Sequence, residues 1–180
     1  MSGQVMSGQV PIPDSRDLRR VMGRFATGIT VVTVGTAEPH GMTANAFTSV
    51  SLEPPLVLVC VKRNAIMHQM IRGCSCFAVS VLAAHQERVA RLFADRHRPR
   101  GKPGFAAIDI IPGPYSGTPV IRGALAWLEC ELTTVYDGGD HSIFIGQVRT
   151  LGCGTTEGAL LFYDGGFHRL VSDELVPNTT

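Results

Sequence analysis

The sequence of 180 residues lacks the features that mark a membrane protein, a secreted protein or a nucleic-acid-binding protein. No apolar run reaches the roughly 20 residues that a membrane helix needs. The N-terminus has no basic segment followed by an apolar one, as a signal peptide would. The formal net charge is only +1, so bulk attraction to nucleic acid or to a membrane surface is not expected. These absences predict a cytoplasmic protein with neither kind of partner.

The familiar motifs of nucleotide binding and catalysis are also missing. Gly152-Cys153-Gly154 is followed by Thr155-Thr156-Glu157, so it fails the GxGxxG pattern, and the chain has no P-loop. We find no convincing catalytic triad, paired carboxylates or metal-ligand cluster in the sequence. A dinucleotide bound by this chain would therefore not be held in the usual α/β manner.

Cysteines are few and odd in number, and none of them is in CxxC spacing. An odd count without that spacing does not favour a disulfide framework or a zinc site. Reduced structural thiols are the expectation, with a metal or redox role for Cys74-Ser75-Cys76 as a minor alternative. The five are Cys60, Cys74, Cys76, Cys130 and Cys153.

The length and the apolar content of 44% are those of one soluble domain with a full hydrophobic core. Met-Ser-Gly-Gln-Val occurs twice in succession at the start of the chain. We expect residues 1–13 to be a disordered leader, residues 14–172 to form the domain, and residues 173–180 to be a flexible tail.

Strand-like segments joined by glycine-containing turns dominate the second half of the chain. The clearest predicted hairpin pairs residues 125–136 with 141–148, and another pairs 160–163 with 167–170. Alternation in the first hairpin places Trp127, Glu129, Glu131 and Thr133 on one face. Many antiparallel strands with few helices favour a closed β-barrel.

Three short helices are expected between the strands. The first is capped by Asp14 or Ser15 and ended by Gly28, and the second is capped by Asn64 and ended by Gly73. The third spans residues 85–95. Residues 95–119 then form a long proline-rich loop, which is typical of a lid or binding loop. Its cations Arg96, Arg98, Arg100 and Lys102 suit either a solvated loop or a lid that attracts phosphates.

The run from His40 to Pro55 is the most informative stretch of the sequence. It is predicted to be a strand that ends at Pro54-Pro55, yet it carries small and hydroxyl side chains where a buried strand has branched apolar ones. Small residues allow a flat ligand to approach the backbone, and Thr, Asn and Ser offer hydrogen bonds. The next strand, residues 56–61, ends in Lys62-Arg63-Asn64. This combination suits an aromatic cofactor that bears a phosphate.

Several segments in the same order resemble the short-chain flavin reductases, the NAD(P)H:flavin oxidoreductase components of two-component flavin-dependent monooxygenases. The resemblance covers roughly residues 16–170. Its segments are residues 25–33 and 41–51, Pro54-Pro55-Leu56-Val57, Lys102-Pro103-Gly104-Phe105, Gly117-Thr118-Pro119, Leu128-Glu129-Cys130, residues 139–148 and 160–163, and Gly165-Gly166-Phe167.

The resemblance implies a mainly β fold: a split β-barrel of the FMN-binding, antiparallel Greek-key type with a few short flanking helices, usually as a homodimer. It implies His141 as the catalytic residue, near the nicotinamide and the flavin. It also implies a cofactor-binding set made of Thr43, Ala44, Asn45, Ala46, Ser49, Val50, Ser51, Cys60, Val61, Lys62, Arg63, Asn64, Lys102, Phe105, His141, Phe162, Tyr163, Gly165 and Gly166. No metal is implied.

The implied reaction is hydride transfer from NADH to FAD or FMN, with NADH favoured over NADPH on family grounds. The reduced flavin would then pass to a partner monooxygenase through a transient encounter. Because the cofactors carry this chemistry, the protein needs no acid–base cluster. A non-catalytic split barrel that stores or senses flavin or haem is the alternative, since a fold does not fix a function. A nucleic-acid-binding barrel is disfavoured because the basic loop lacks interleaved aromatic residues.

Overall fold

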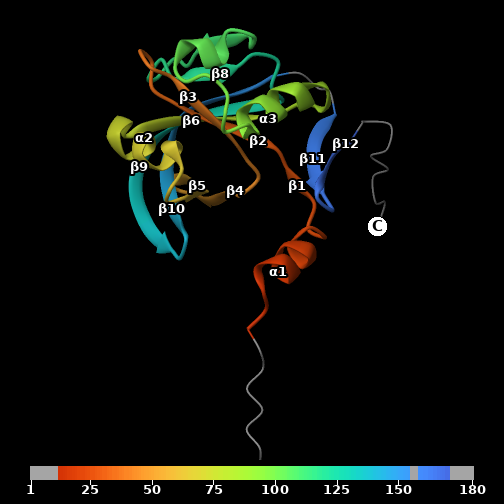
Figure 1. The fold of residues 1–180 in the computed structure, drawn as a ribbon. Helices are drawn as coiled ribbons and strands as arrows, with labels where there is room; N and C mark the ends of the chain where they lie inside the picture. Colours follow the sequence, from red (N-terminus) through yellow and green to blue (C-terminus); the bar gives the residue numbers. More distant parts are fainter. Residues whose placement is uncertain (1–11, 155–157, 171–180) are drawn as a thin grey trace, which may run out of the picture.

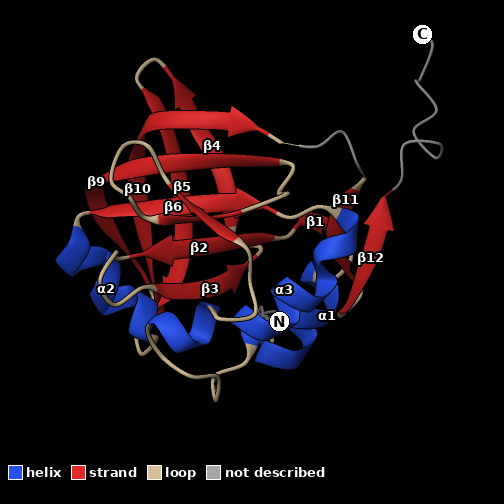
Figure 2. Cartoon of the chain, turned by 90° about the horizontal axis from the view of Figure 1, so that it is seen from above, coloured by secondary structure: helices blue, strands red, loops and turns tan. Residues whose placement is uncertain are grey.

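The computed structural model describes residues 12–154 and 158–170. The duplicated segment and the predicted tail lie outside the described residues, so the predicted leader and tail stay predictions. A curved, fully antiparallel sheet forms the body of the protein (Figures 1 and 2). Its strands, in spatial order, are β3 (His40–Ala44), β2 (Thr30–Val34), β6 (Cys76–Val81), β9 (Ala126–Gly138), β10 (His141–Cys153), β5 (Pro55–Lys62) and β4 (Phe47–Leu52).

The two outermost strands of this sheet, β3 and β4, are neighbours in the chain. Only Asn45 and Ala46 separate them, and the Cys60 amide donates to the Ala46 carbonyl at 3.0 Å. This run of chain therefore pairs with β2 at one end and with β5 at the other, so it joins the two edges of the sheet and leaves a seam between β3 and β5. The run predicted as one strand is thus two strands with a break at Asn45-Ala46.

The barrel interior is filled by branched and aromatic side chains, including Val59, Phe77 and Phe144, which have no exposed surface. The register of β10 against β9 shifts between Ile145 and Gly146. A Cβ on Gly146 would lie 2.5 Å from the Phe77 ring. Glycine is required here because the aromatic ring occupies the space of a side chain.

Two smaller sheets complete the β structure. β1 (Thr27–Gly28), β11 (Ala159–Tyr163) and β12 (Gly166–Leu170) form one, and β7 (Ile110–Pro112) and β8 (Pro119–Ile121) form the other. Both predicted hairpins are confirmed, and the first is longer than predicted because β9 and β10 extend in pairs to Ala126 and Cys153.

The helices begin or end at different residues from those predicted. α1 (Ser15–Met22) is capped by Asp14 as predicted but ends at Gly23, because Gly28 pairs with β11 instead. α2 (Ile66–Cys74) starts after Ala65, without a side-chain cap from Asn64. α3 (Glu87–Ala94) follows a short turn, η1 (Ala84–Gln86), and the long loop contains a second one, η2 (Lys102–Phe105). α2 and α3 lie beside β3 (Figure 2).

The predicted polar face of the first hairpin contains one buried acid. Glu129 on β9 has no exposed surface, and its carboxylate accepts hydrogen bonds from the backbone amides of Tyr115 and Ser116. This carboxylate holds the loop between β7 and β8 against the barrel.

Candidate functional site

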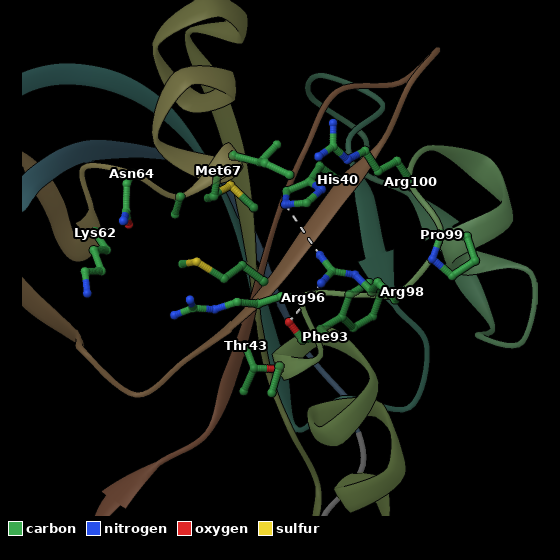
Figure 3. Close-up of a pocket in the computed structure, with 14 residues that line it drawn as sticks. His40, Thr43, Lys62, Asn64, Met67, Phe93, Arg96, Arg98, Pro99 and Arg100 are labelled. Atoms are coloured by element: carbon green, nitrogen blue, oxygen red, sulfur yellow. Dashed lines mark hydrogen bonds between the residues drawn. The ribbon is translucent and has the colours of Figure 1, made fainter.

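Two cavities open along the seam where the barrel closes. The large cavity, of about 880 Å³, lies between the end of α1, the β1–β11 pair and the β3–β4 connection. The second, of about 390 Å³, lies between β3, the start of α2 and the loop after α3 (Figure 3). We call it the cationic cavity because Lys62, Arg96, Arg98 and Arg100 line it. Both volumes fall within or close to the usual range of small-molecule sites, about 300–1,000 Å³.

The large cavity has mostly apolar walls with a few polar groups. Its apolar lining includes Phe25, Phe47, Leu58 and Phe162. Thr27 also lines it, but the Thr27 hydroxyl oxygen is itself buried and has no hydrogen-bond partner among the described residues. The polar groups on its wall include Asn45 and Thr48. The cavity fits a flat, largely apolar ligand with polar edges, such as a flavin ring.

The end of α1 is fixed at the mouth of the large cavity by the turn between β11 and β12. The Asp164 amide donates to the Gly23 carbonyl at 2.8 Å, and the Arg24 guanidinium lies 3.5 Å from the Asp164 carboxylate. The side chains of Leu18, Val21 and Phe25 remain more than half exposed. α1 therefore walls the cavity through Arg19 and Met22 and presents apolar side chains to solvent, at a position that projects from the barrel (Figure 1).

Arg98 shapes the cationic cavity from inside. Its guanidinium donates to the carbonyls of Gly41 and Asp95 and lies over the Phe93 ring at 5.4 Å. It also reaches the Nε2 atom of His40 (Figure 3). Burial, then Arg98 and Arg100, lower the pKa of His40 to about 4. His40 is therefore neutral at pH 7, and the positive charge of the cavity comes from its lysine and arginines.

The two cavities follow one another along β5 and β3. Cys60 lines the large cavity, and Lys62, two residues further along β5, lines the cationic cavity. Residues two apart in a strand point to the same face and lie about 6.6 Å apart. On β3, Thr43 lines the cationic cavity, while Asn45 beyond the strand lines the large one. An elongated ligand can thus extend from one cavity into the other.

The turn between β9 and β10 lies beside Lys62. His141 is directly opposite Lys62 in the β5–β10 ladder, so their side chains project from the same face. His141 Nδ1 lies 2.7 Å from the Asp140 carboxylate, and Lys62 Nζ lies 4.0 Å from it. The hydrogen bond from His141, more than the charge of Lys62, lowers the pKa of Asp140.

Arg63 fixes the position of this turn. Its guanidinium donates to the Gly139 carbonyl at 2.8 Å and pairs with the Asp137 carboxylate at 2.7 Å. The Gly139 amide in turn donates to Asp137. This amide and then Arg63 lower the pKa of Asp137. The guanidinium of Arg63 is therefore engaged by groups of the protein itself, whereas Lys62 next to it faces the cationic cavity.

The structure brings together about half of the cofactor-binding residues implied by the resemblance. Asn45, Ala46, Cys60, Phe162 and Gly165 line the large cavity, and Thr43, Lys62 and Asn64 line the cationic cavity. Ala44 and Val61 are buried in the barrel core behind these residues.

The remaining implied residues line neither cavity. Phe105 is buried in the second core cluster against Phe93, and Lys102 is exposed on η2. Ser49, Val50 and Ser51 lie on the outermost strand β4, while Tyr163 and Gly166 lie in the β11–β12 hairpin beside the large cavity. Arg63 and His141 lie at the rim, as described above.

Sequence reasoning missed the apolar half of the cationic cavity and the α1 side of the large one. Met42, Ile66, Met67 and Phe93 come from β3, α2 and α3, and each fits the ordinary apolar pattern of its own element. Phe25 and Thr27 stood in a matching segment but received no role. The loop arginines were noticed, and three of them line the cationic cavity.

Within the described residues, no group of histidines, cysteines and acids could hold a metal ion. The helices of this part of the chain include none that is long and apolar enough to cross a membrane. All five cysteines lie within the described residues and are free.

Comparison with known proteins identifies the fold and the family. Residues 22–171 match the model of the flavin reductase-like domain. An NADH-dependent FAD reductase of Streptomyces globisporus is 53% identical over 160 residues, which cover 89% of this chain and 88% of the relative. The reductase subunit HsaB of a flavin-dependent monooxygenase of Rhodococcus jostii is 37% identical, with 91% of this chain and 82% of the relative covered.

Solved structures agree with these matches. BorF, the flavin reductase component of a bacterial two-component tryptophan halogenase, superposes with a TM-score of 0.85 at 51% identity, covering 88% of this chain and 99% of the other. The Streptomyces globisporus NADH:FAD oxidoreductase in complex with NAD and FAD fragments gives a TM-score of 0.83 at 49% identity, covering 92% and 99%. The resemblance read from the sequence and the predicted split barrel are confirmed: the chain belongs to the flavin reductase family.

Proposed function

We propose that this protein is an NADH-dependent reductase of FAD that releases the reduced flavin to a separate flavin-dependent oxygenase or halogenase. The single observation that carries the proposal is the pair of neighbouring cavities along one seam, with mostly apolar walls in the large cavity and cations in the other. The names of the relatives in Streptomyces and Rhodococcus support NADH, FAD and an oxygenase partner.

In this proposal the flavin ring occupies the large cavity. Phe25, Phe162 and Leu58 would pack on it, and Asn45 would bond its polar edge. The ribityl chain would run along β5 past Cys60, so that the phosphate reaches Lys62 and Asn64. The two bound cofactors would supply the hydride chemistry, and the chain would supply alignment, exclusion of water and a matching electrostatic environment.

His141, which lies opposite Lys62 at the end of β5, is proposed to contact the nicotinamide dinucleotide bound beside the flavin. A carboxylate only accepts hydrogen bonds, so the short contact to Asp140 assigns the proton to Nδ1 of His141. Nε2 is then left for the ligand. Asp140 acts through His141 and is a positioning residue, since it fixes the tautomer and the orientation of the ring.

We also propose a homodimer in which the apolar face of α1 is covered. None of the α1 residues is buried in the single chain, and Leu18, Val21 and Met22 are all more than half exposed. Apolar side chains of this size gathered on one short helix are typical of an interaction surface. Light scattering should give twice the mass of one chain. A monomer at micromolar concentration would remove the reason for placing a partner on α1.

The cytoplasmic location stays a prediction.

The test of the function is oxidation of NADH, and separately NADPH, by purified protein with added FMN, FAD or riboflavin. The proposal expects turnover that requires free flavin and is fastest with NADH and FAD. Tight flavin binding without turnover for any pair would instead support a storage or sensor protein. His141→Ala should lower kcat/KM at least tenfold, and Asp140→Asn should do so to a smaller extent. His97→Ala, a change at an exposed loop histidine, is the matched control and should not.

A further inference from the structure

The hairpin tip that carries His141, residues 133–142, has fewer neighbours than the rest of the barrel. β9 pairs with β6 only from Ala126 to Glu131, so residues 133–138 have β10 as their single strand partner in the described part of the chain. His141 is the first residue of β10 and lies opposite Lys62, the last residue of β5. A strand end with few neighbours opens more readily than the centre of a sheet. The position of His141 therefore depends on side chains that hold this tip.

Two side chains from the segment after β5 hold the hairpin tip. The Arg63 side chain and its ion-pair partner Asp137 are 48% and 77% exposed, and exposed pairs contribute little. His68, in the first turn of α2, reaches β10 itself, because its Nε2 atom lies 2.9 Å from Oγ of Ser142. Ser142 directly follows His141 and is only 4% exposed. The buried bond is the stronger of the two, since losing either partner leaves a buried polar group unsatisfied.

The surroundings of His68 fix its ring. The ring lies edge-on to Phe144, with the ring centroids 5.2 Å apart and an angle of 80° between the planes. Burial, followed by Arg72 and Arg63, lowers the pKa of His68, so the ring is neutral at pH 7. His68 lines neither cavity. Any effect of His68 on the reaction must therefore pass through Ser142 and the strand.

We propose that His68 is a positioning residue for the reaction: through Ser142 it fixes the start of β10 and so holds the His141 ring beside the bound nicotinamide dinucleotide. This inference rests on the proposed function. His141 and Ser142 are consecutive in the strand, so their side chains point to opposite faces. The bond on the inner face sets the direction in which His141 projects from the outer one. Asp140 then fixes the tautomer of a ring whose backbone His68 has placed.

The test uses His68→Phe, Ser142→Ala and the double variant that combines them. Phenylalanine keeps a ring against Phe144 but lacks the nitrogen that bonds Ser142. Each single variant leaves one buried polar group without a partner and should be less stable than wild type, whereas the double variant replaces both partners with apolar groups and should regain most of the stability. Gln69→Ala, a change at an exposed neighbour on α2, is the matched control and should behave as wild type.

Kinetics separate positioning from stability. Each single variant and the double variant should lower kcat/KM for NADH about fivefold, the factor expected for one ordinary hydrogen bond, while Kd for FAD stays unchanged. Equal losses in all three would show that the two residues act as one pair. His68→Gln, whose amide reaches as far as Nε2, should restore the rate, and the shorter His68→Asn should not. A double variant with wild-type stability and wild-type kcat/KM would overturn the proposal, because the bond would then serve folding alone.

The tautomer of His141 gives a readout that needs no turnover. In wild-type protein the contact with Asp140 holds the proton on Nδ1, which heteronuclear NMR of the nitrogen-labelled protein should detect at pH 8. In the double variant the His141 ring should populate both neutral tautomers, because it is no longer held against Asp140. An unchanged tautomer in the double variant would refute the role of His68 whether or not the protein reduces flavin. A changed tautomer in a protein without turnover would refute only the proposed function.

Discussion

We expect the buried carboxylate of Glu129 to stabilise the protein measurably, because it holds the loop between β7 and β8 against the barrel. One carboxylate oxygen accepts from the Ser116 amide at 2.9 Å and lies 2.7 Å from the Ser116 hydroxyl, and the other accepts from the Tyr115 amide at 2.7 Å. Glu129→Gln replaces one of these acceptors with an NH₂ group. One backbone amide then faces a donor and loses its partner.

The size of the effect follows from two opposing terms. A buried donor without a partner costs about 1–3 kcal/mol, and bonds to a charged group are worth about 1.5–3 kcal/mol each. Removing the charge also removes the cost of burying it, which offsets part of this loss. Because both oxygens of Glu129 are in use, we expect the loss to prevail and the free energy of unfolding to fall by about 2 kcal/mol.

The assay is urea unfolding followed by the fluorescence of Trp127, the single tryptophan of the chain, which lies two residues from Glu129. Glu131→Gln is the matched control, since this side chain is 45% exposed and its contacts to Tyr115 and Arg149 are 3.3 and 3.4 Å long. It should change stability by less than about 0.5 kcal/mol. A Glu129→Gln protein as stable as wild type would refute the account of how the loop is held.

Two further predictions concern the wall of the cationic cavity. Gly41→Ala would place a Cβ 2.5 Å from the Phe93 ring and should lower the free energy of unfolding by about 1–3 kcal/mol in thermal melts. Gly73 lies at an open helical position, so Gly73→Ala should raise the free energy of unfolding by about 0.5–1 kcal/mol. The pKa of His40 falls from 6.5 to about 4 on folding, so the unfolded chain binds more protons between these values and stability falls as the pH drops from 6.5 to 4. His40→Gln should make this fall shallower in urea titrations at pH 7, 6, 5 and 4.5, and an unchanged slope would contradict the shift.

The hairpins were predictable because their signals are local. Alternating residues flank the turns at Gly138-Gly139 and Gly165-Gly166, and both turns contain a glycine with positive φ. The helix ends could not be predicted, since they depend on partners that are distant in the sequence. Thr27 and Gly28 form a strand instead of extending α1 because they pair with β11. No feature of residues 20–28 reveals this pairing.

The candidate site also has a part that could be predicted from the sequence and a part that could not. The hydroxyl-rich run and the cations after β5 were visible in the sequence, and the family resemblance gave them a common role. The break at Asn45-Ala46 was not visible, although it places β3 and β4 at opposite edges of the sheet. The apolar wall was equally hidden, because Met42, Met67 and Phe93 meet only after three elements pack together.

The seam between β3 and β5 explains how a barrel with a filled interior can still bind a large cofactor. The interior of this barrel is occupied by side chains such as Phe77 and Phe144, so a ligand cannot enter it. Breaking the strand run at Asn45-Ala46 leaves a seam instead, with backbone and small side chains at its floor and α1 and the arginine loop as separate walls. Each wall contacts a different part of an elongated ligand. Substitutions on the α1 side should therefore alter the affinity for FMN, FAD and riboflavin alike, as a titration of each flavin would measure.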